Sequence, residues 1–358
     1  MKKTLLLAVL LLAAAGRAGA ELTSRLKIDV YGSVKTDLLY SDHGTTANEY
    51  RTYAVSGRAD RAFRASARAS RFGLNLSSGS AVSGKMEADF LGLTDSVGGA
   101  AGTVSDVRLR HAYVVFAAGK AEILAGQTWY PITADLPETL NDYALGNSGM
   151  LWARAPQLRA SYATAGKLKL IAAVVRPTAK LTDAEGTHSA RPGLQAKVEK
   201  EVGKARFSLA GAAGVWKSTS TQKTADTSVL VAAFSVPAGR FALSGEAWAG
   251  RNLSDFLGGL GNTGYGEKAV PAKGGYLALK YKPAQTLWFN LVYGVDDPDN
   301  NKVLTRGKTR NSTALVNAVA RFHGCVETGL EASSLNTSYK NLQARSSLNY
   351  QFTVKLLF

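Results

Sequence analysis

The sequence predicts an all-β fold, a transmembrane antiparallel β-barrel of about sixteen strands, on three observations. Apolar and polar residues alternate along most of the chain, short turns alternate with longer polar segments, and the N-terminus reads as an export signal. Alternation by itself also fits a soluble β-sandwich. The alternation of short and long connections and the export signal therefore decide between a membrane barrel and a soluble sandwich.

The N-terminal stretch MKKTLLLAVLLLAAAGRAGA has the three parts of a secretory signal peptide. It has a positive start, an apolar stretch over residues 5–15 and small residues at 18–20 where cleavage is expected. An uncleaved anchor helix is the alternative, but Arg17 and the small residues interrupt the apolar run. We expect residues 1–20 to be removed.

The turn signals set the expected number of strands. They lie near Gly79, Gly119, Gly166, Gly203, Gly239, Pro283 and Gly324. The longer polar segments between them are 42–62, 95–105, 131–148, 177–190, 218–225, 253–272 and 297–309. With a last short loop near Lys340, this parity predicts an even strand count, short periplasmic turns and long outer loops. No domain boundary interrupts the pattern, so residues 21–358 are expected to form one barrel domain.

Two faces can be assigned along each expected strand. In the last one, SLNYQFTVKLLF, the apolar phase carries Tyr350, Phe352 and Val354, and the other phase carries Gln351 and Thr353. Charged residues elsewhere fall on the second phase, where a water-filled lumen accepts them at little cost. Aromatic girdles at the membrane interfaces are expected from Tyr31, Tyr40, Tyr113, Tyr293, Trp129 and Trp152.

The charge balance points to anionic partners. The formal net charge is +16, and loss of Lys2, Lys3 and Arg17 with the signal peptide leaves +13. Small anions and the phosphates of lipid or lipopolysaccharide fit this excess, whereas export argues against nucleic acid. The single cysteine, Cys325, excludes an intramolecular disulfide, so burial or barrel closure must hold the chain together.

The stretch RADRAFRASARASRFGLNL concentrates arginines before a clear strand. In an extended chain Arg64 and Arg68 share one face, and Arg71 joins them only if a bulge lies near Ala69–Ser70. Spacings of three and four also fit one face of a loop helix. Both interpretations place guanidinium groups at or near the mouth of the barrel.

Further arginines fall opposite apolar neighbours. Arg108 and Arg110 lie opposite Val107 and Leu109, and a bulge expected at Pro156 would turn Arg154 and Arg159 the same way. The candidate pore-lining, anion-binding residues are Arg64, Arg68, Arg71, Arg108, Arg110, Arg154 and Arg159, with Arg206, Arg321 and Arg345 on inner phases too. Solvated charges or lipopolysaccharide contacts are the alternative.

The segment 131–148, PITADLPETLNDYALGNS, is a long loop that carries Asp135, Glu138 and Asp142. If it folds inward, its carboxylates face the basic wall across a constriction, as charged rings do in other channels. An ordinary outer loop is the alternative interpretation.

These features resemble a family. ARASRFGL at 67–74, RLRHAYV at 108–114, LAGQTW at 124–129 and RAPQLRASY at 154–162, with the terminal Phe358, are similar in order and spacing to the Gram-negative outer-membrane porins of the DcaP-like trimeric type. The resemblance implies a homotrimer of sixteen-stranded barrels with a basic channel for small anions, dicarboxylates among them. It carries over Arg68, Arg71, Arg108, Arg110, Arg154 and Arg159 as lumen residues.

Two features depart from that pattern. ELTSRLK leads almost directly into the first strand, without the periplasmic coiled-coil segment that such porins often have. His111 falls on the apolar phase, which indicates either a subunit interface or a misread register.

The leading functional prediction is a passive channel in the Gram-negative outer membrane, with no cofactor and no metal. Two alternatives stay open: an outer-membrane hydrolase with a loop-borne site at His43 or His188, and a non-conducting structural or adhesive barrel. No G-x-S-x-G motif supports the hydrolase, and one cysteine with scattered histidines gives no zinc spacing.

Overall fold

The alternating segments form β-strands in the computed structural model, which describes residues 26–46, 51–55, 61–92, 106–177, 188–218 and 221–358. The expected signal peptide, 1–20, lies outside the described residues. The strands are β1 (Lys27–Ser41), β2 (Ala62–Ser66), β3 (Arg71–Ser78), β4 (Val82–Asp89), β5 (Arg108–Ala118), β6 (Ala121–Trp129), β7 (Arg154–Ala163), β8 (Leu168–Val175), β9 (Gly193–Val202), β10 (Ala205–Lys217), β11 (Thr224–Ala238), β12 (Phe241–Arg251), β13 (Pro271–Ala284), β14 (Leu287–Pro298), β15 (Lys308–Phe322), β16 (Val326–Tyr339) and β17 (Leu342–Leu357). Three short 3-10 helices, η2 (Leu253–Phe256), η3 (Gly259–Gly261) and η4 (Gly266–Lys268), lie between β12 and β13.

The sheet closes on itself. β1 pairs antiparallel with β17, and its other edge pairs with β3 near its start and with β2 near its end. β2 and β3 are thus two parts of one barrel strand, so the 17-stranded sheet has sixteen barrel strands. This confirms the predicted antiparallel barrel. Closure through β1 and β17 removes the two free edges that an open sheet would expose to lipid.

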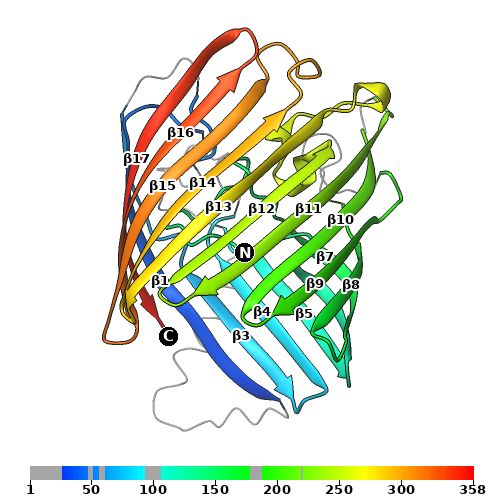
Figure 1. Cartoon of the computed structure of the whole chain (residues 1–358), viewed down its shortest axis with the longest axis vertical. Coiled ribbons are helices and arrows are strands. Elements are labelled where there is room, and N and C mark those ends of the chain that lie inside the picture. Colours follow the sequence, from blue (N-terminus) through cyan, green and yellow to red (C-terminus); the bar gives the residue numbers. More distant parts are fainter. Residues whose placement is uncertain (1–25, 47–50, 56–60, 93–105, 178–187, 219–220) are drawn as a thin grey trace, which may run out of the picture.

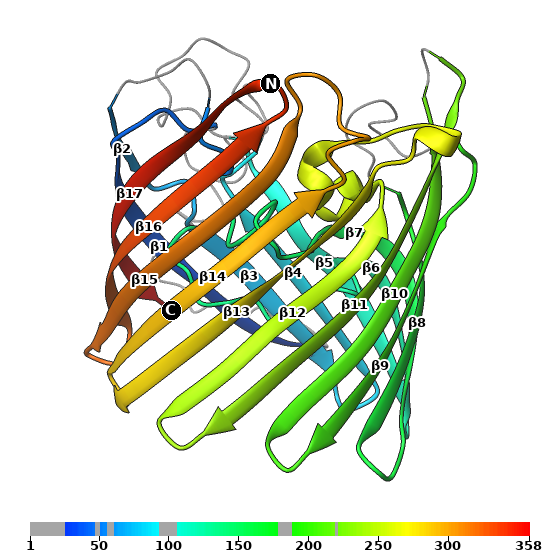
Figure 2. The same cartoon turned by 45° about the horizontal axis from the view of Figure 1, so that its top comes forward.

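The parity of the connections is also confirmed. The turns that follow the odd-numbered strands β3 to β15 contain two to four residues, and the connections that follow the even-numbered strands β4 to β14 contain six or more. The last turn, between β16 and β17, contains two residues, as expected near Lys340. Figures 1 and 2 show the tight turns along the lower rim and the longer connections along the upper rim. No helix in the described part of the chain is both long and apolar enough to cross a membrane.

The two faces of the strands separate as the sequence predicts. Val30 and Val34 on β1 are exposed on the outside, whereas Lys35 and Asp37 on the other phase are each 6% exposed. The same alternation runs along β17, where Tyr350 is exposed and Gln351 is buried.

The chain breaks register where the arginine-rich stretch requires it. A turn over residues 67–70, in which the Ser70 amide donates to the Ala67 carbonyl at 3.1 Å, separates β2 from β3. The expected break near Ala69–Ser70 is confirmed, and residues 62–66 are strand and not helix. Because of this break, Arg64 and Arg71 both lie on the inner phase of the barrel.

Two details of register differ from the predictions. The β4–β5 ladder shifts between Glu87 and Ala88, so that His111 opposes Glu87 and falls on the inner face. At Pro156 the expected bulge was wrong, since β6 and β7 pair without a shift from Tyr162 to Arg154. A proline near the start of a strand is accommodated because it omits one donor without displacing the chain.

The expected aromatic girdles are mostly wrong. Tyr40 and Tyr293 lie on the outer phase, but Tyr31 donates its hydroxyl to Glu87 on the inside at 2.8 Å. Trp129 and Trp152 pack edge to face with ring centroids 5.5 Å apart, within a cluster inside the barrel. Tyr113 opposes Lys85 and also lies on the inner phase. The missed bulge in β5 explains the error for Tyr113 alone. Tyr31 shares the polar phase of Lys35 on β1, and Trp152 lies outside the strands.

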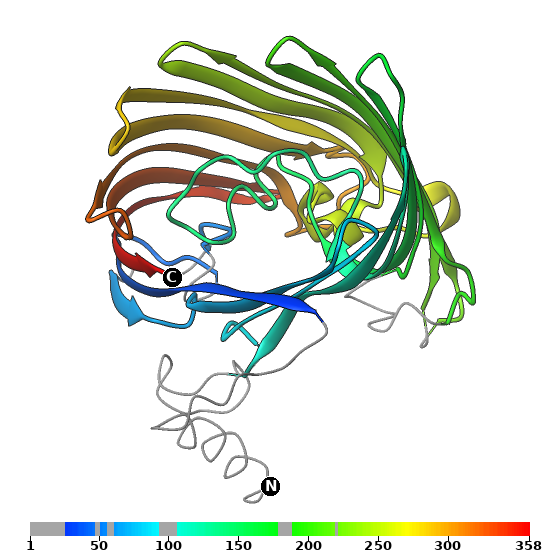
Figure 3. The ribbon, with the colours of Figure 1, turned by 90° about the horizontal axis from the view of Figure 1, so that it is seen from below.

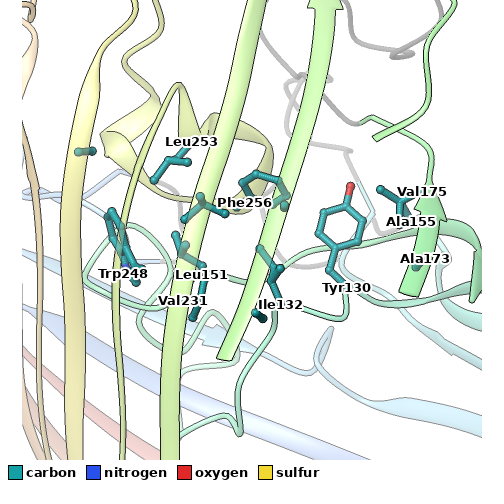
Figure 4. Packing of buried hydrophobic residues seen from close by; sticks show 14 residues of the cluster. Tyr130, Ile132, Leu151, Ala155, Ala173, Val175, Val231, Trp248, Leu253 and Phe256 are labelled. Atoms are coloured by element: carbon teal, nitrogen blue, oxygen red, sulfur yellow. The ribbon is translucent and has the colours of Figure 1, made fainter. Parts of the chain in front are cut away.

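A buried apolar core fills the upper part of the lumen. Leu253 and Phe256 of η2 pack on Leu151 and Ile132 from the segment 130–153, as Figure 4 shows. Tyr130 and wall residues of β7, β8 and β10 to β13 complete the cluster: Ala155, Ala173, Val175, Ala210, Ala212, Val229, Val231, Trp248 and Ala272. The two inward segments are joined further because the Trp152 amide donates to the Phe256 carbonyl at 3.0 Å. This core positions the functional site below it.

Candidate functional site

The segment 130–153, between β6 and β7, lies inside the barrel. Figure 3 shows it within the ring of strands when the barrel is viewed from below. Its backbone is bound by inward side chains of the wall: Asn317 donates to the Glu138 carbonyl at 2.9 Å, and Trp248 donates to the Gly149 carbonyl at 2.7 Å. Glu331 accepts from the Leu140 amide at 2.7 Å. The wall thus supplies hydrogen-bond partners to a chain that would otherwise lie unpaired in the lumen.

Glycines allow this segment to approach the wall. Gly149 has φ +106°, and a Cβ there would collide with the carbonyl of Gly275 on β13. On β14, a Cβ at Gly294 would fall on the carbonyl oxygen of Ser148. The residues at these contacts must therefore lack side chains.

All three predicted loop carboxylates form ion pairs with the wall. Asp135 pairs with Arg206 on β10, and Glu138 pairs with Lys280 on β13. Asp142 pairs with Lys35 on β1 and with Arg71 on β3, the latter at 2.9 Å. The carboxylates thus face cations across the lumen, an arrangement that brings opposite charges together at the loop.

The pKa of Asp142 is set by two opposing effects. Burial favours the neutral carboxylic acid and raises the pKa, but the charges of Lys35 and Arg71 outweigh burial and hold the pKa below its usual range. Lys35 is fixed from three sides, since its Nζ also lies 2.8 Å from the Leu140 carbonyl and 3.1 Å from Asp37.

Arg108 and Arg110 are neutralised by acids on the neighbouring strand. Arg108 forms a bidentate pair with Asp89, at 2.9 and 2.6 Å. Arg110, at the β5 bulge, binds Glu87 through Nε and Asp89 through Nη1, the latter at 2.8 Å. Asp89 is 1% exposed and Arg110 6%, so this cluster is largely shielded from solvent.

The other predicted arginines have varied surroundings. Arg68 donates to the carbonyls of Phe90 and Gly92, at 3.1 and 2.9 Å, and so ties the turn to the end of β4. Arg154 stacks over the Trp129 ring, 4.4 Å from its centroid. Arg159 donates to the Trp129 carbonyl and to Gln157. Arg64 opposes Leu39 on the inner phase. Their expected contact with solute stays a prediction.

Sequence reasoning weighed arginines and passed over lysines near the tight turns. Lys280 and Lys282 lie on the face of β13 that points away from Tyr281. Lys355 on β17 is the cross-strand partner of Lys35 on β1. The signal was present, because these lysines occupy the same wet phase as the arginines. What the sequence does not show is that these strands meet beneath the inward segment.

A hollow of about 460 Å³ lies between residues 136–142 and the wall formed by β13 to β17, β1 and β3. Six cationic side chains line it against three carboxylates. The cations are Lys35, Arg71, Lys280, Lys282, Arg321 and Lys355, and the carboxylates are Glu138, Asp142 and Glu327. This hollow therefore carries a local excess of positive charge.

The two loop histidines of the hydrolase alternative, His43 and His188, lie among the described residues. His43 lies 3.0 Å from Asp42, but the Ser347 hydroxyl donates to the His43 carbonyl and not to its ring. No group of three His, Cys, Asp or Glu residues suited to a metal ion occurs in the part of the chain that the structure describes.

Comparison with known proteins places this geometry in context. No family model and no curated protein matches the chain. The outer membrane channel DcaP of Acinetobacter baumannii superposes with a TM-score of 0.82 at 18% identity, over 95% of this chain and 100% of that one. The anion-selective porin from Comamonas acidovorans gives a TM-score of 0.63 at 12% identity, over 93% and 100%.

A trimer form of OmpT, an outer membrane protein of Vibrio cholerae, gives a TM-score of 0.61 at 13% identity, over 93% of this chain and 99% of that one. Likeness at such low identity establishes architecture. With its closed sixteen-stranded barrel and inward segment, this chain has the fold of the outer-membrane porins.

Proposed function

We propose that the chain is a porin of a Gram-negative outer membrane, a passive diffusion channel whose basic lumen favours small anions, dicarboxylates among them. The observation that carries the proposal is the excess of cations around the hollow beneath the segment 130–153. A charged wall of low dielectric constant concentrates counter-ions and raises their rate of entry. No chemical step is needed for this function.

The inward segment is proposed as the constriction of the channel. Its carboxylates hold wall cations in place, as Asp142 does for Lys35 and Arg71. A constriction of this kind leaves cations and carboxylates on facing surfaces, so a dipolar or anionic solute is oriented as it passes. Selectivity then depends on which cations remain accessible to the solute.

A homotrimer in a bilayer that contains lipopolysaccharide is part of the proposal. Support for the trimer comes from the trimer form of one structurally similar protein. The exposed apolar outer phase, including Leu230 and Leu291, each 58% exposed, suits contact with lipid or with a neighbouring barrel.

Reversal potential tests the proposal. Purified protein in a planar bilayer without lipopolysaccharide, under a KCl gradient around 0.1 M, is expected to show anion selectivity. Cation selectivity would contradict the basic lumen, and the absence of conductance would favour a structural barrel. Hydrolysis of ester or amide substrates by the same preparation, lost on His43→Ala, would favour the enzyme.

A further inference from the structure

We infer that the hollow holds a subsite for small dianions, formed by Lys282, Arg321 and Lys280 around Trp288 and completed by Lys355. This inference rests on the proposed function and specifies where the anion binds. The subsite lies on β13, β14, β15 and β17, away from the arginines on β5 and β7 that the sequence singled out.

One indole ring gathers three cations. The charged groups of Lys280, Arg321 and Lys282 lie 5.3, 5.6 and 5.8 Å from the centroid of the Trp288 ring. Cations within about 6 Å of an indole are attracted to its face. Trp288 itself is 7% exposed and packed into the wall. A rigid buried ring thus holds flexible side chains together before a ligand arrives, which lowers the entropic cost of binding.

The local charges are not balanced. Lys280 pairs with Glu138, while Arg321 and Lys355 share Glu327, the latter at 3.3 Å. Lys282 lies within ion-pair distance of no carboxylate among the described residues. Four cations therefore share two carboxylates, and an anion with two charges would balance the remainder. This favours a dianion over a monoanion.

The subsite lies nearer to the rim of tight turns than to the opposite rim. Lys282 lies three residues before the β13–β14 turn, and Arg321 lies two residues before the β15–β16 turn. Above it, Glu138 and Leu140 of the inward segment approach the wall, and a Cβ at Gly329 would collide with Leu140. Solute from the rim of tight turns therefore reaches the subsite before it meets the constriction.

The arginine-rich wall is less suited to the same role. Arg108 and Arg110 already bind Asp89 and Glu87, so an added anion would compete with fixed carboxylates. Displacing those contacts would leave buried carboxylates unpaired, which is costly.

The test measures block of single-channel KCl current by succinate, a dianion, with acetate as the monoanion, added to either side. We expect succinate to block more strongly from the tight-turn side than from the other side, and acetate to block weakly from both. Lys282→Gln should weaken the succinate block from the tight-turn side about tenfold, the size expected for one charge-assisted contact. Lys282→Arg should retain the block. Lys204→Gln, in an exposed turn on the same rim, is the matched control for a lost surface charge.

The outcomes separate the inference from the proposed function. An anion-selective wild type whose succinate block is unchanged by Lys282→Gln, or equally reduced by Lys204→Gln, overturns the subsite and leaves the porin proposal intact. A wild type without anion selectivity refutes the proposed function itself. Circular dichroism of the β-sheet in detergent confirms that each variant is folded, and Arg321→Gln serves as a second variant if Lys282→Gln does not fold.

Discussion

At the scale of single residues, the lumen contains two kinds of cation. Arg110 is 6% exposed and bound by two carboxylates, so it compensates buried charge within the wall. Lys282 lies near a rim and has no carboxylate partner among the described residues. Since both residues occupy the wet phase, alternation alone does not distinguish them. Their partners decide whether a cation supports the structure or meets solute.

Replacement of Arg110 should therefore affect stability more than selectivity. Arg110→Gln leaves Glu87 and Asp89 with fewer partners in a shielded place, and breaking a buried pair from one side costs about 3–5 kcal/mol. Denaturant unfolding in detergent, followed by tryptophan fluorescence, measures the loss. Lys282→Gln is the comparison and should change stability little. If Arg110→Gln is as stable as the wild type but loses anion selectivity, Arg110 belongs to the solute path.

Asp142 predicts how stability depends on pH. Its pKa is lower in the folded chain than in the unfolded chain, so its contribution is complete above the unfolded pKa of about 3.9 and is lost as pH falls through the folded pKa. The melting temperature should thus not depend on this group from pH 7 to about 5, and it should fall in stronger acid. Asp142→Asn should lower the melting temperature at pH 7 and reduce that acid dependence. Asp29→Asn, which breaks an exposed pair with Lys27, is the control and should do neither.

At the scale of elements, the sequence predicts strands and turns well because both are local. Side chains alternate along each strand whatever its neighbours are, and tight turns need local residue types. The break at 67–70 was predictable, since the phase of the arginines changes within one short stretch. The bulge at Arg110 was missed because it depends on the pairing of β5 with Glu87 and Ala88 on another strand. For the same reason Asp89 was not predicted as the partner of Arg108.

The inward segment 130–153 should respond to single methyl groups on the wall. Gly294→Ala adds a Cβ that falls on the Ser148 carbonyl, so the segment must move away from β14. Overpacking of this kind costs about 1–3 kcal/mol, and the displaced segment should alter the single-channel conductance. In the matched control Gly211→Ala, the new Cβ meets its nearest atom at 3.5 Å, an ordinary contact, so conductance should be unchanged. Equal conductance in both variants would show that the contact of the inward segment with β14 does not set the channel width.

At the scale of the whole molecule, closure separates two environments with one sheet. The outer phase is apolar around the barrel, and the inner phase gathers charges that are far apart in the sequence, such as Lys35 and Lys355. The formal charge of the full sequence, +16, does not itself reveal where the excess lies. The position of the charges matters more than their sum, because only cations that line a water-filled path act on a passing ion.

This difference can be measured through salt. Screening lengths are about 10 Å at 0.1 M and about 3 Å at 1 M, so lumen charges that act on ions in a wide passage lose influence as KCl rises. We expect the ratio of chloride to potassium permeability to be highest in dilute KCl and to fall toward the ratio of the free ions' mobilities near 1 M. Lys282→Gln should lower the ratio in dilute salt and converge with the wild type in concentrated salt, whereas Lys204→Gln should follow the wild type throughout. A ratio independent of salt would mean that selectivity arises from the fixed geometry of the passage and not from its charge.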